Sequence, residues 1–134
     1  MTPVNSDKMP VRNSGDILLV RQTVRSKAVE LGFSLVDQTK IVTAASELAR
    51  NTVDYGGGGT VVFETLNDNG RRGLRLTFED QGPGIPDIQL ALKDGWTSGS
   101  GLGLGLSGAK RLMSDFHIES KVGLGTKVVV TRWK

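Results

Sequence analysis

Glu47 and Asn51 lie four residues apart in a segment whose apolar residues recur at the spacing of a helix. Side chains one helical turn apart project from the same patch of surface, so this carboxylate and this amide are expected to share one site. Glu47 is predicted to lie half-buried in a cleft, where a carboxylate that has lost part of its hydration is a better general base. The amide oxygen of Asn51 suits Mg²⁺, whose other ligands would be phosphates and water. The alternative is an ordinary solvated helix face.

Asp80 ends a predicted strand and is followed by turn-forming residues up to Gly84. A carboxylate in this position can accept a hydrogen bond from the exocyclic amine of adenine, whereas the keto group of guanine would be repelled. Gly82 and Gly84 allow the backbone to pass close to a flat base, and Pro83 stiffens the bend between them. Ile85, the next residue, is assigned to the same nucleotide site. The alternative is a plain turn.

The stretch 101–108 places glycine at alternate positions, with leucines between them, and leads into a predicted helix. Bare backbone amides and the positive end of a helix dipole both suit phosphate oxygens. The residues assigned to this role are Ser100, Gly101, Leu102, Gly103, Leu104 and Gly105. A flexible linker is the alternative, but the interleaved leucines argue against it. The stretch also matches the Rossmann fingerprint, without the βαβ context which that fingerprint requires, and no Walker A motif occurs.

A fourth pattern, 123–126, reads Gly-Leu-Gly-Thr and joins two predicted strands as a hairpin turn. Thr126 is expected to reach the base or a water molecule beside Asp80. Each of the four patterns is a weak signal by itself. In this order, within one small domain, they describe a pocket for a purine nucleoside triphosphate, with ATP and Mg²⁺ as the expected ligands.

These residues need elements that hold them around one cleft. Helices are predicted over 14–31, with Ser14 as the N-cap, over 34–55, with Ser34 as the N-cap, and over 85–93 and 104–114. Strands are predicted over 60–66, 74–78, 116–121 and 126–133, with a hairpin turn at 67–70 and a polar loop at 93–100. This order is typical of an α+β fold, here a two-layer sandwich whose mixed, mostly antiparallel sheet has helices on one face. A single domain over 1–134 is expected.

The composition limits the functions that this chain can have. The 134 residues include no cysteine, which excludes disulfides and thiolate metal sites, and the single histidine, His117, cannot form a zinc site alone. Neither a transmembrane run nor a signal peptide is recognisable, so a cytoplasmic protein without a membrane partner is expected. The formal charge of +3 is spread along the chain, which favours a solvated surface over nucleic-acid binding.

Taken together, the four patterns resemble the motifs of the GHKL ATPase superfamily, which includes gyrase, Hsp90, histidine kinases and MutL and binds ATP in the Bergerat fold. The matches are Glu47 and Asn51 to the N box, Asp80, Gly82 and Gly84 to the first glycine box, Gly101, Gly103 and Gly105 to the second, and Gly125 and Thr126 to the last. The resemblance implies that Glu47 is the catalytic base, that Asn51 holds Mg²⁺ and that Asp80 reads adenine.

Within that superfamily, a chain of this size is similar to the bacterial anti-sigma-factor serine kinases, and most of all to switch kinases of the RsbT type. This resemblance implies phosphorylation of a Ser or Thr on a STAS-domain antagonist in stress or sigma-factor partner switching, and a second partner such as a phosphatase or a sigma factor. The sequence departs from relatives at two places. Asp54 stands where histidine kinases usually carry a basic residue. Ser100 precedes the second glycine box where some anti-sigma kinases have an arginine, so Mg²⁺, backbone amides, or a residue from elsewhere, such as Lys93 or one from the substrate protein, would have to stabilise the γ-phosphate.

Two other functions fit the same residues. The chain could be an anti-sigma factor that acts mainly by sequestering its partner, with the nucleotide as a structural ligand. It could also be an ATPase module of the histidine-kinase type that acts in trans on a partner histidine.

Overall fold

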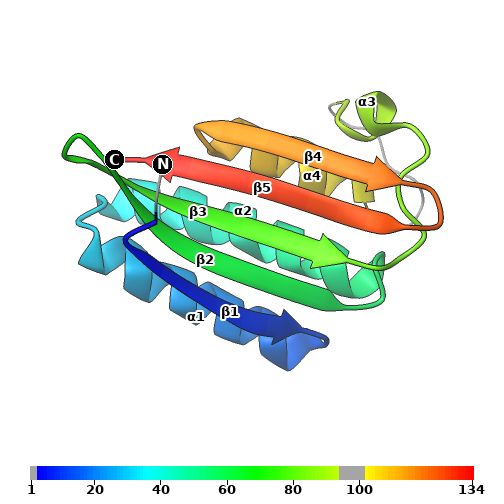
Figure 1. The fold of residues 1–134 in the computed structure, drawn as a ribbon, viewed down its shortest axis with the longest axis horizontal. Coiled ribbons are helices and arrows are strands. Elements are labelled where there is room, and N and C mark those ends of the chain that lie inside the picture. The colour runs from blue at the N-terminus through cyan, green and yellow to red at the C-terminus, as the bar shows by residue number, and fades with distance from the viewer. Residues whose placement is uncertain (1–2, 94–101) are drawn as a thin grey trace.

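The computed structural model describes residues 3–93 and 102–134, which form a two-layer α+β sandwich (Figure 1). Its strands are β1 (Asn5–Val11), β2 (Gly59–Asp68), β3 (Arg71–Asp80), β4 (Asp115–Lys121) and β5 (Gly125–Trp133). Its helices are α1 (Ser14–Glu30), α2 (Leu35–Asp54), α3 (Ile88–Ala91) and α4 (Leu102–Leu112). The predicted α+β class is confirmed.

The strands of the described ranges form one sheet in the order β1-β2-β3-β5-β4. The prediction of a mixed sheet is wrong, because every neighbouring pair in this order is antiparallel. The β2–β3 and β4–β5 pairs are hairpins, and β5 then inserts between β3 and β4, antiparallel to both. This insertion sets Thr126, at the start of β5, opposite Asp80, at the end of β3.

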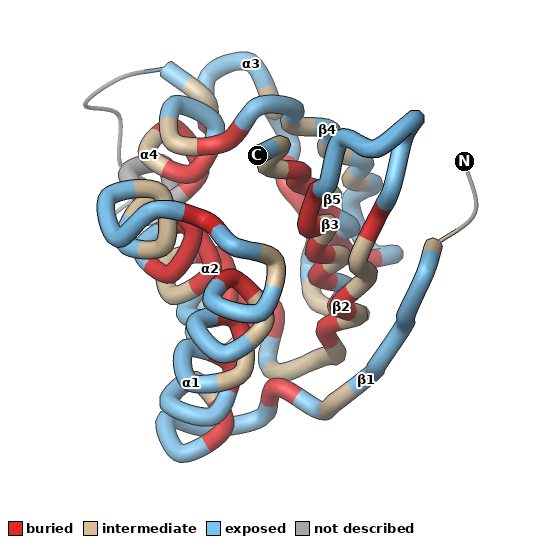
Figure 2. The backbone as a smooth tube through the Cα atoms, turned by 90° about the vertical axis from the view of Figure 1, so that its left-hand side faces the viewer, coloured by how far each residue is buried: buried red, intermediate tan, exposed pale blue. Residues whose placement is uncertain are grey.

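Helices α1, α2 and α4 cover one face of the sheet, and the buried residues of the two layers face each other (Figure 2). The apolar stripes predicted on α1 and α2 form the helical side of this core, as the helical period requires. The buried side chains from both layers include Val20, Val24, Ile41, Leu48, Phe63, Leu76, Phe78, Leu106 and Val130. No helix in the described part of the chain is long and apolar enough to cross a membrane.

The helix caps differ in part from the prediction. Asn13, not Ser14, caps α1, because its side-chain oxygen accepts the Asp16 amide at 3.0 Å. Ser34 caps α2 as predicted, accepting the Asp37 amide at 3.1 Å. The carboxylate of Asp37 does not bond back to the cap; it pairs instead with Arg132.

Arg132 connects the sheet to helices α2 and α4 at one end of the sandwich. From β5 it donates to Asp37, near the start of α2, at 2.9 Å and to the carbonyl of Leu112, at the end of α4, at 3.0 Å. The spread of charge along the sequence favoured a solvated surface for basic residues, but the Arg132 side chain is only 21% exposed. Because the start of α2 meets the end of α4, these helices run antiparallel, and the start of α4 lies toward the end of α2 that carries Asn51.

Other differences lie at element ends. The edge strand β1 is not predicted, because its first four residues are polar, most of the strand is exposed and its sequence gives no alternating pattern. The turn at 67–70 is confirmed, with positive φ angles of 54° at Asn69 and 88° at Gly70. Helix α3 is shorter than predicted, and α4 begins at Leu102, so Gly103 and Gly105 belong to its first turn and not to a preceding loop. The predicted loop, with Ser100 and Gly101, lies outside the described residues.

Candidate functional site

A narrow cavity lies where α2 crosses the ends of β3 and β5. Its lining is Leu48, Asn51, Thr52, Tyr55, Phe78, Asp80, Ile85, Leu106, Thr126 and Val128. Apolar walls with a few convergent polar groups are typical of a small-molecule site. The cavity measures about 20 Å³, room for about one water molecule, so a bound base requires the lining side chains to move apart.

The cavity brings together four of the residues that the sequence singled out, from elements that are distant in the chain. Asn51 comes from α2, Asp80 from the end of β3, Ile85 from the loop that follows, and Thr126 from β5. Glu47 does not line it, although it lies one turn before Asn51 on the same helix.

Asp80 is the polar group whose environment is most unusual, because its carboxylate is buried with only 8% of the residue exposed. Burial raises its pKa above the ordinary value, and backbone N–H groups of Gly82, at 2.9 Å, and of Thr126 oppose that rise only in part. A carboxylate that keeps acceptor capacity inside a poorly hydrated cavity is suited to a hydrogen bond from a ligand amine.

Gly56 allows the Asp80 carboxylate to occupy this position, a role that the sequence did not reveal. A methyl group on Gly56 would lie 2.6 Å from Oδ2 of Asp80, and one on Gly82 would lie 2.7 Å from the Cα atom of Gly56. The loop after α2 and the turn after β3 therefore approach each other at backbone distance beside this carboxylate. The available signal was the run of four glycines from 56 to 59, which directly follows the helix of Asn51 in the sequence.

Tyr55 holds the loop after β3 against the end of α2. Its hydroxyl donates to the carbonyl of Gly84 at 2.8 Å. Gly84 has a φ of 78° and lies directly against the backbone of Lys121, so both the dihedral and the space require glycine. Tyr55 was not predicted as a site residue, because its partner is distant in the sequence.

The amide group of Asn51 carries a nitrogen that is buried and has no hydrogen-bond partner within the described ranges. Such an orphaned group is costly unless a ligand satisfies it. The two ends of a side-chain amide are interchangeable by a flip, so Asn51 can present either a donor or an oxygen to the cavity. These residues therefore fit a nucleotide, and the oxygen fits a Mg²⁺ that takes its other ligands from phosphates and water. No group of three acidic or histidine side chains that could hold a metal occurs among the described residues.

Glu47 lies at the open edge of this site. Its side chain is 38% exposed, and its Oε1 atom is 3.4 Å from Nη1 of Arg50. The sequence predicted a half-buried Glu47, and its burial is intermediate, although it does not line the cavity. This exposure leaves Glu47 accessible to a group that arrives from outside.

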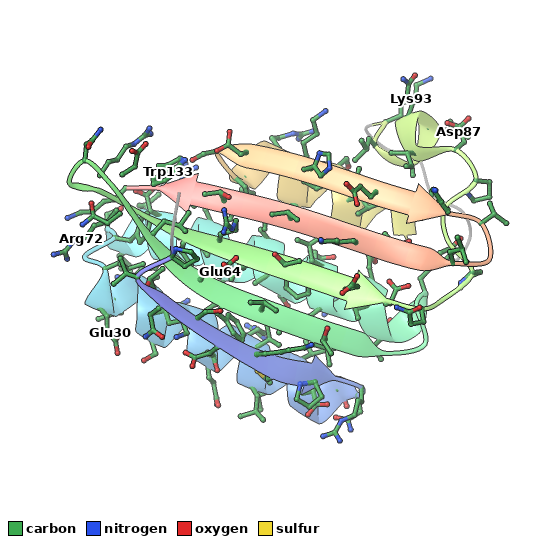
Figure 3. All side chains as sticks on the ribbon, viewed as in Figure 1. Glu30, Glu64, Arg72, Asp87, Lys93 and Trp133 are labelled. Atoms are coloured by element: carbon green, nitrogen blue, oxygen red, sulfur yellow. The ribbon has the colours of Figure 1, made fainter. Side chains whose placement is uncertain are left out.

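Other candidate residues lie elsewhere. His117 is exposed on β4 and lies 3.2 Å from Glu119. Lys93 is exposed after α3, and its side chain extends away from the sheet (Figure 3). Leu102 to Gly105 form the first turn of α4, and Ser100 and Gly101 are not among the described residues.

A larger hollow of about 180 Å³ lies nearby at the edge of the sheet, lined by charged side chains such as Glu79, Glu119 and Lys127. It shares Asp80 and Thr126 with the cavity, but it does not include Asn51 and lacks the apolar walls that enclose a base. The cavity at Asn51 is therefore the better candidate for a nucleotide base.

Comparison with known proteins agrees with this geometry. Residues 36–134 match the model of the HATPase_c family, described as histidine kinase-, DNA gyrase B- and HSP90-like ATPases. The chain is 49% identical over 118 residues to the serine/threonine-protein kinase RsbT of Bacillus subtilis, covering 88% of this chain and 89% of that protein. It is 30% identical to an anti-sigma F factor of Clostridium acetobutylicum, covering 84% and 81% respectively.

Solved structures share the fold. The RsbU and RsbW domains of a Mycobacterium tuberculosis protein match with a TM-score of 0.66 and 21% identity, over 99% of this chain and 34% of that one. The SiaB–SiaC complex of Pseudomonas aeruginosa matches with a TM-score of 0.55 and 8% identity, over 98% of this chain and 91% of that one. At these identities the likeness is one of fold alone.

Asp80→Asn is expected to weaken ATP binding by about 10- to 100-fold, because a charge-assisted hydrogen bond is lost.

The same substitution should affect stability. The pKa of Asp80 is raised in the folded protein, so its contribution to stability is present below the unfolded pKa and is lost as pH rises through the folded pKa. At neutral pH the ionised group is therefore destabilising, and the variant should unfold at an equal or higher temperature. Calorimetric titration measures the ATP affinity, and thermal melts measure the unfolding temperature. Undiminished ATP affinity would contradict the role of Asp80 in nucleotide binding.

Gly56→Ala is expected to displace the Asp80 carboxylate and to abolish detectable ATP binding at concentrations that saturate the native protein. Gly57→Ala is the matched control in the same loop. It suffers the strain of a φ of 76°, but its new methyl group meets no atom within 4 Å. Titration with ATP should separate the two, and equal loss of affinity in both would show that the loop and not the Asp80 contact matters.

Proposed function

Since the chain belongs to the family of histidine kinase-, DNA gyrase B- and HSP90-like ATPases and, at 49% identity to RsbT, is a protein serine/threonine kinase, we propose that its substrate is a Ser or Thr of a STAS-domain antagonist protein. The reaction is a step of partner switching in the cytoplasm, after which a second partner, a phosphatase or a sigma factor, is released or captured. The observation that carries the proposal is the placement of Glu47, exposed to an incoming protein yet one turn from the cavity residue Asn51.

Adenine recognition is assigned to the cavity between α2 and the sheet. Asp80 accepts a hydrogen bond from the exocyclic amine, and the apolar walls formed by Leu48, Ile85 and Leu106 hold the faces of the ring. The start of α4 lies toward the same end of α2, so the backbone N–H groups of its first turn and its positive dipole end can receive phosphate oxygens.

The amide oxygen of Asn51 would hold Mg²⁺, and the ion would supply positive charge to offset that of the phosphates. The substrate hydroxyl oxygen forms a bond to the γ-phosphorus while the bond from that phosphorus to the β,γ-bridging oxygen breaks, and ADP leaves. Glu47 accepts the hydroxyl proton. Arg50, 3.4 Å from Glu47, orients that carboxylate. Most of the rate enhancement then comes from positioning and electrostatics.

The groove between α1 and α2 is assigned to the protein substrate. Two hollows of about 310 Å³ and 190 Å³ follow it, lined by Ser14, Ile17, Leu18, Arg21, Gln22, Arg25, Val42, Ser46, Arg50 and Asp54. Arg21 and Arg25 are exposed one turn apart, and Leu18 beside them is 53% exposed. A substrate segment with acidic residues and one apolar side chain complements the charge and the exposed leucine of this groove. Arg50, which lines the groove, donates a hydrogen bond to Glu47, so the groove reaches the proposed base.

Sequestration is the second candidate, favoured by the 30% identity to an anti-sigma F factor. Incubation with γ-labelled ATP and a serine-bearing STAS protein separates the two functions. Label on the STAS protein supports the kinase, whereas a tight complex with a sigma factor and no transferred label supports sequestration.

Glu47→Gln is expected to lower phosphoryl transfer by about 10²- to 10⁴-fold, the usual contribution of a general base, because the amide cannot accept the proton. ATP affinity should remain within about twofold of native, since Glu47 does not line the cavity. Transfer is measured with labelled ATP and affinity by calorimetry. A variant that transfers phosphate at the native rate would rule out this role.

Arg21→Glu is expected to raise the KM for the protein substrate about three- to tenfold, because it places a like charge against an acidic segment. The ATP affinity should not change. Arg72→Glu, which makes the same charge change on β3 at the opposite end of the sheet from α3, is the control (Figure 3). Equal effects of both substitutions would indicate a general charge effect and no docking at α1.

A further inference from the structure

The hairpin between β2 and β3 presents an asparagine followed by a glycine at its tip. Asp68 pairs with Arg71, so the connection consists of Asn69 and Gly70. Their φ angles of 54° and 88° are those of a two-residue turn in the left-handed region. Residues 67–70 are all exposed, so water has access to the whole turn.

Asn67 adds a hydrogen bond that the strand pairing does not supply. Its Oδ1 atom accepts the backbone N–H of Gly70 at 2.8 Å. The pairing of the two strands ends with Asp68 and Arg71, so the N–H of Gly70 lies beyond it. A side chain therefore holds an amide that water would otherwise solvate.

We propose that Asn69 is a site of spontaneous deamidation and that Asn67 slows this reaction by holding the Gly70 nitrogen that would attack. The proposal goes beyond the proposed function and does not depend on it. The hairpin lies at the opposite end of β3 from Asp80 and the nucleotide cavity (Figure 1).

The reaction needs only the chain and water. The backbone nitrogen of Gly70 forms a bond to Cγ of Asn69 while the bond from Cγ to Nδ2 breaks, and ammonia leaves with the proton of the attacking nitrogen. Gly70 has no side chain to hinder this approach. Water then opens the cyclic succinimide at either carbonyl, which gives an aspartate or an isoaspartate at position 69.

The hydrogen bond from Gly70 to Asn67 opposes the first step. Attack requires the Gly70 nitrogen to lose its proton and its peptide plane to turn toward the side chain of Asn69. While the Asn67 oxygen accepts that N–H, the proton is held and the plane is fixed. The hydrogen bond must therefore open first, which should slow deamidation about two- to tenfold.

Deamidation here would disturb more than the turn. An isoaspartate inserts an extra carbon atom into the main chain, so Asp68 and Arg71 could not keep their present pairing. The Arg71 guanidinium lies over the Trp133 ring, 5.1 Å from its centre, and the carbonyl of Arg72 accepts the N–H of Lys134 at 2.8 Å. The end of β5 is therefore attached to this hairpin.

The test follows the peptide that contains residue 69 by mass spectrometry while the folded protein is incubated at mildly alkaline pH. Asn67→Ala should deamidate about two- to tenfold faster than the native chain. Asn67→Asp keeps an oxygen acceptor and should deamidate at the native rate or more slowly. In denaturant the three chains should deamidate at the same rate, because the hydrogen bond is absent there.

Gly70→Ala is the control for the attacking nitrogen. Its methyl group would meet no atom of the fold within 4 Å, although a φ of 88° strains it, and it should slow deamidation by crowding the nitrogen. Asn13, which is followed by Ser14, is the internal control and should keep its amide in every variant.

Equal rates for folded Asn67→Ala and the folded native protein would overturn the protective role of Asn67. Retention of the Asn69 amide in denaturant would overturn the site itself. Both measurements are made without nucleotide or protein substrate, so neither outcome bears on the proposed function.

Discussion

The close approach of the loop after α2 to the turn after β3, around the Asp80 carboxylate, is the constraint on which the rest of the site depends. An ionisable group is held with 8% exposure, and backbone amides compensate for only part of its lost hydration. Such an arrangement persists only when the surrounding fold imposes it. Here Gly56 and Gly82 make the arrangement possible, because their missing side chains let the end of α2 and the turn after β3 meet at that carboxylate.

This constraint separates an enclosed cavity, which is suited to a nucleotide, from an open surface around Glu47. Asp80, Thr126 and Asn51 converge inside a cavity whose other walls are apolar, where hydrogen bonds to a ligand are strong because water is scarce. Glu47 stands outside, at 38% exposure, on the same helix as Asn51. One rigid helix thus connects a nucleotide site to a surface that another protein can reach. The Arg132 bridge at its far end holds that helix against the sheet and α4.

Much of the fold could be predicted from the sequence, since the hydrophobic period along α1 and α2 and the alternation along β3 are local signals. The turn at 67–70 and the Ser34 cap were equally local. The edge strand β1 was missed because an edge strand needs no apolar face, and its polar residues pair with β2 on one side only. The predicted N-cap of α1, Ser14, lies one residue after the observed cap, Asn13, because asparagine and serine cap helices about equally well.

The sequence by itself determined which chemical groups are present, their order, and the helices and strands that carry them, because these follow from residue type and short-range spacing. Only the tertiary structure decided which groups meet. Insertion of β5 between β3 and β4 puts Thr126 opposite Asp80, and the same insertion brings Ser120 to Ile85. Contacts between residues tens of positions apart arise from how the layers pack as a whole, and no local preference of the chain encodes them.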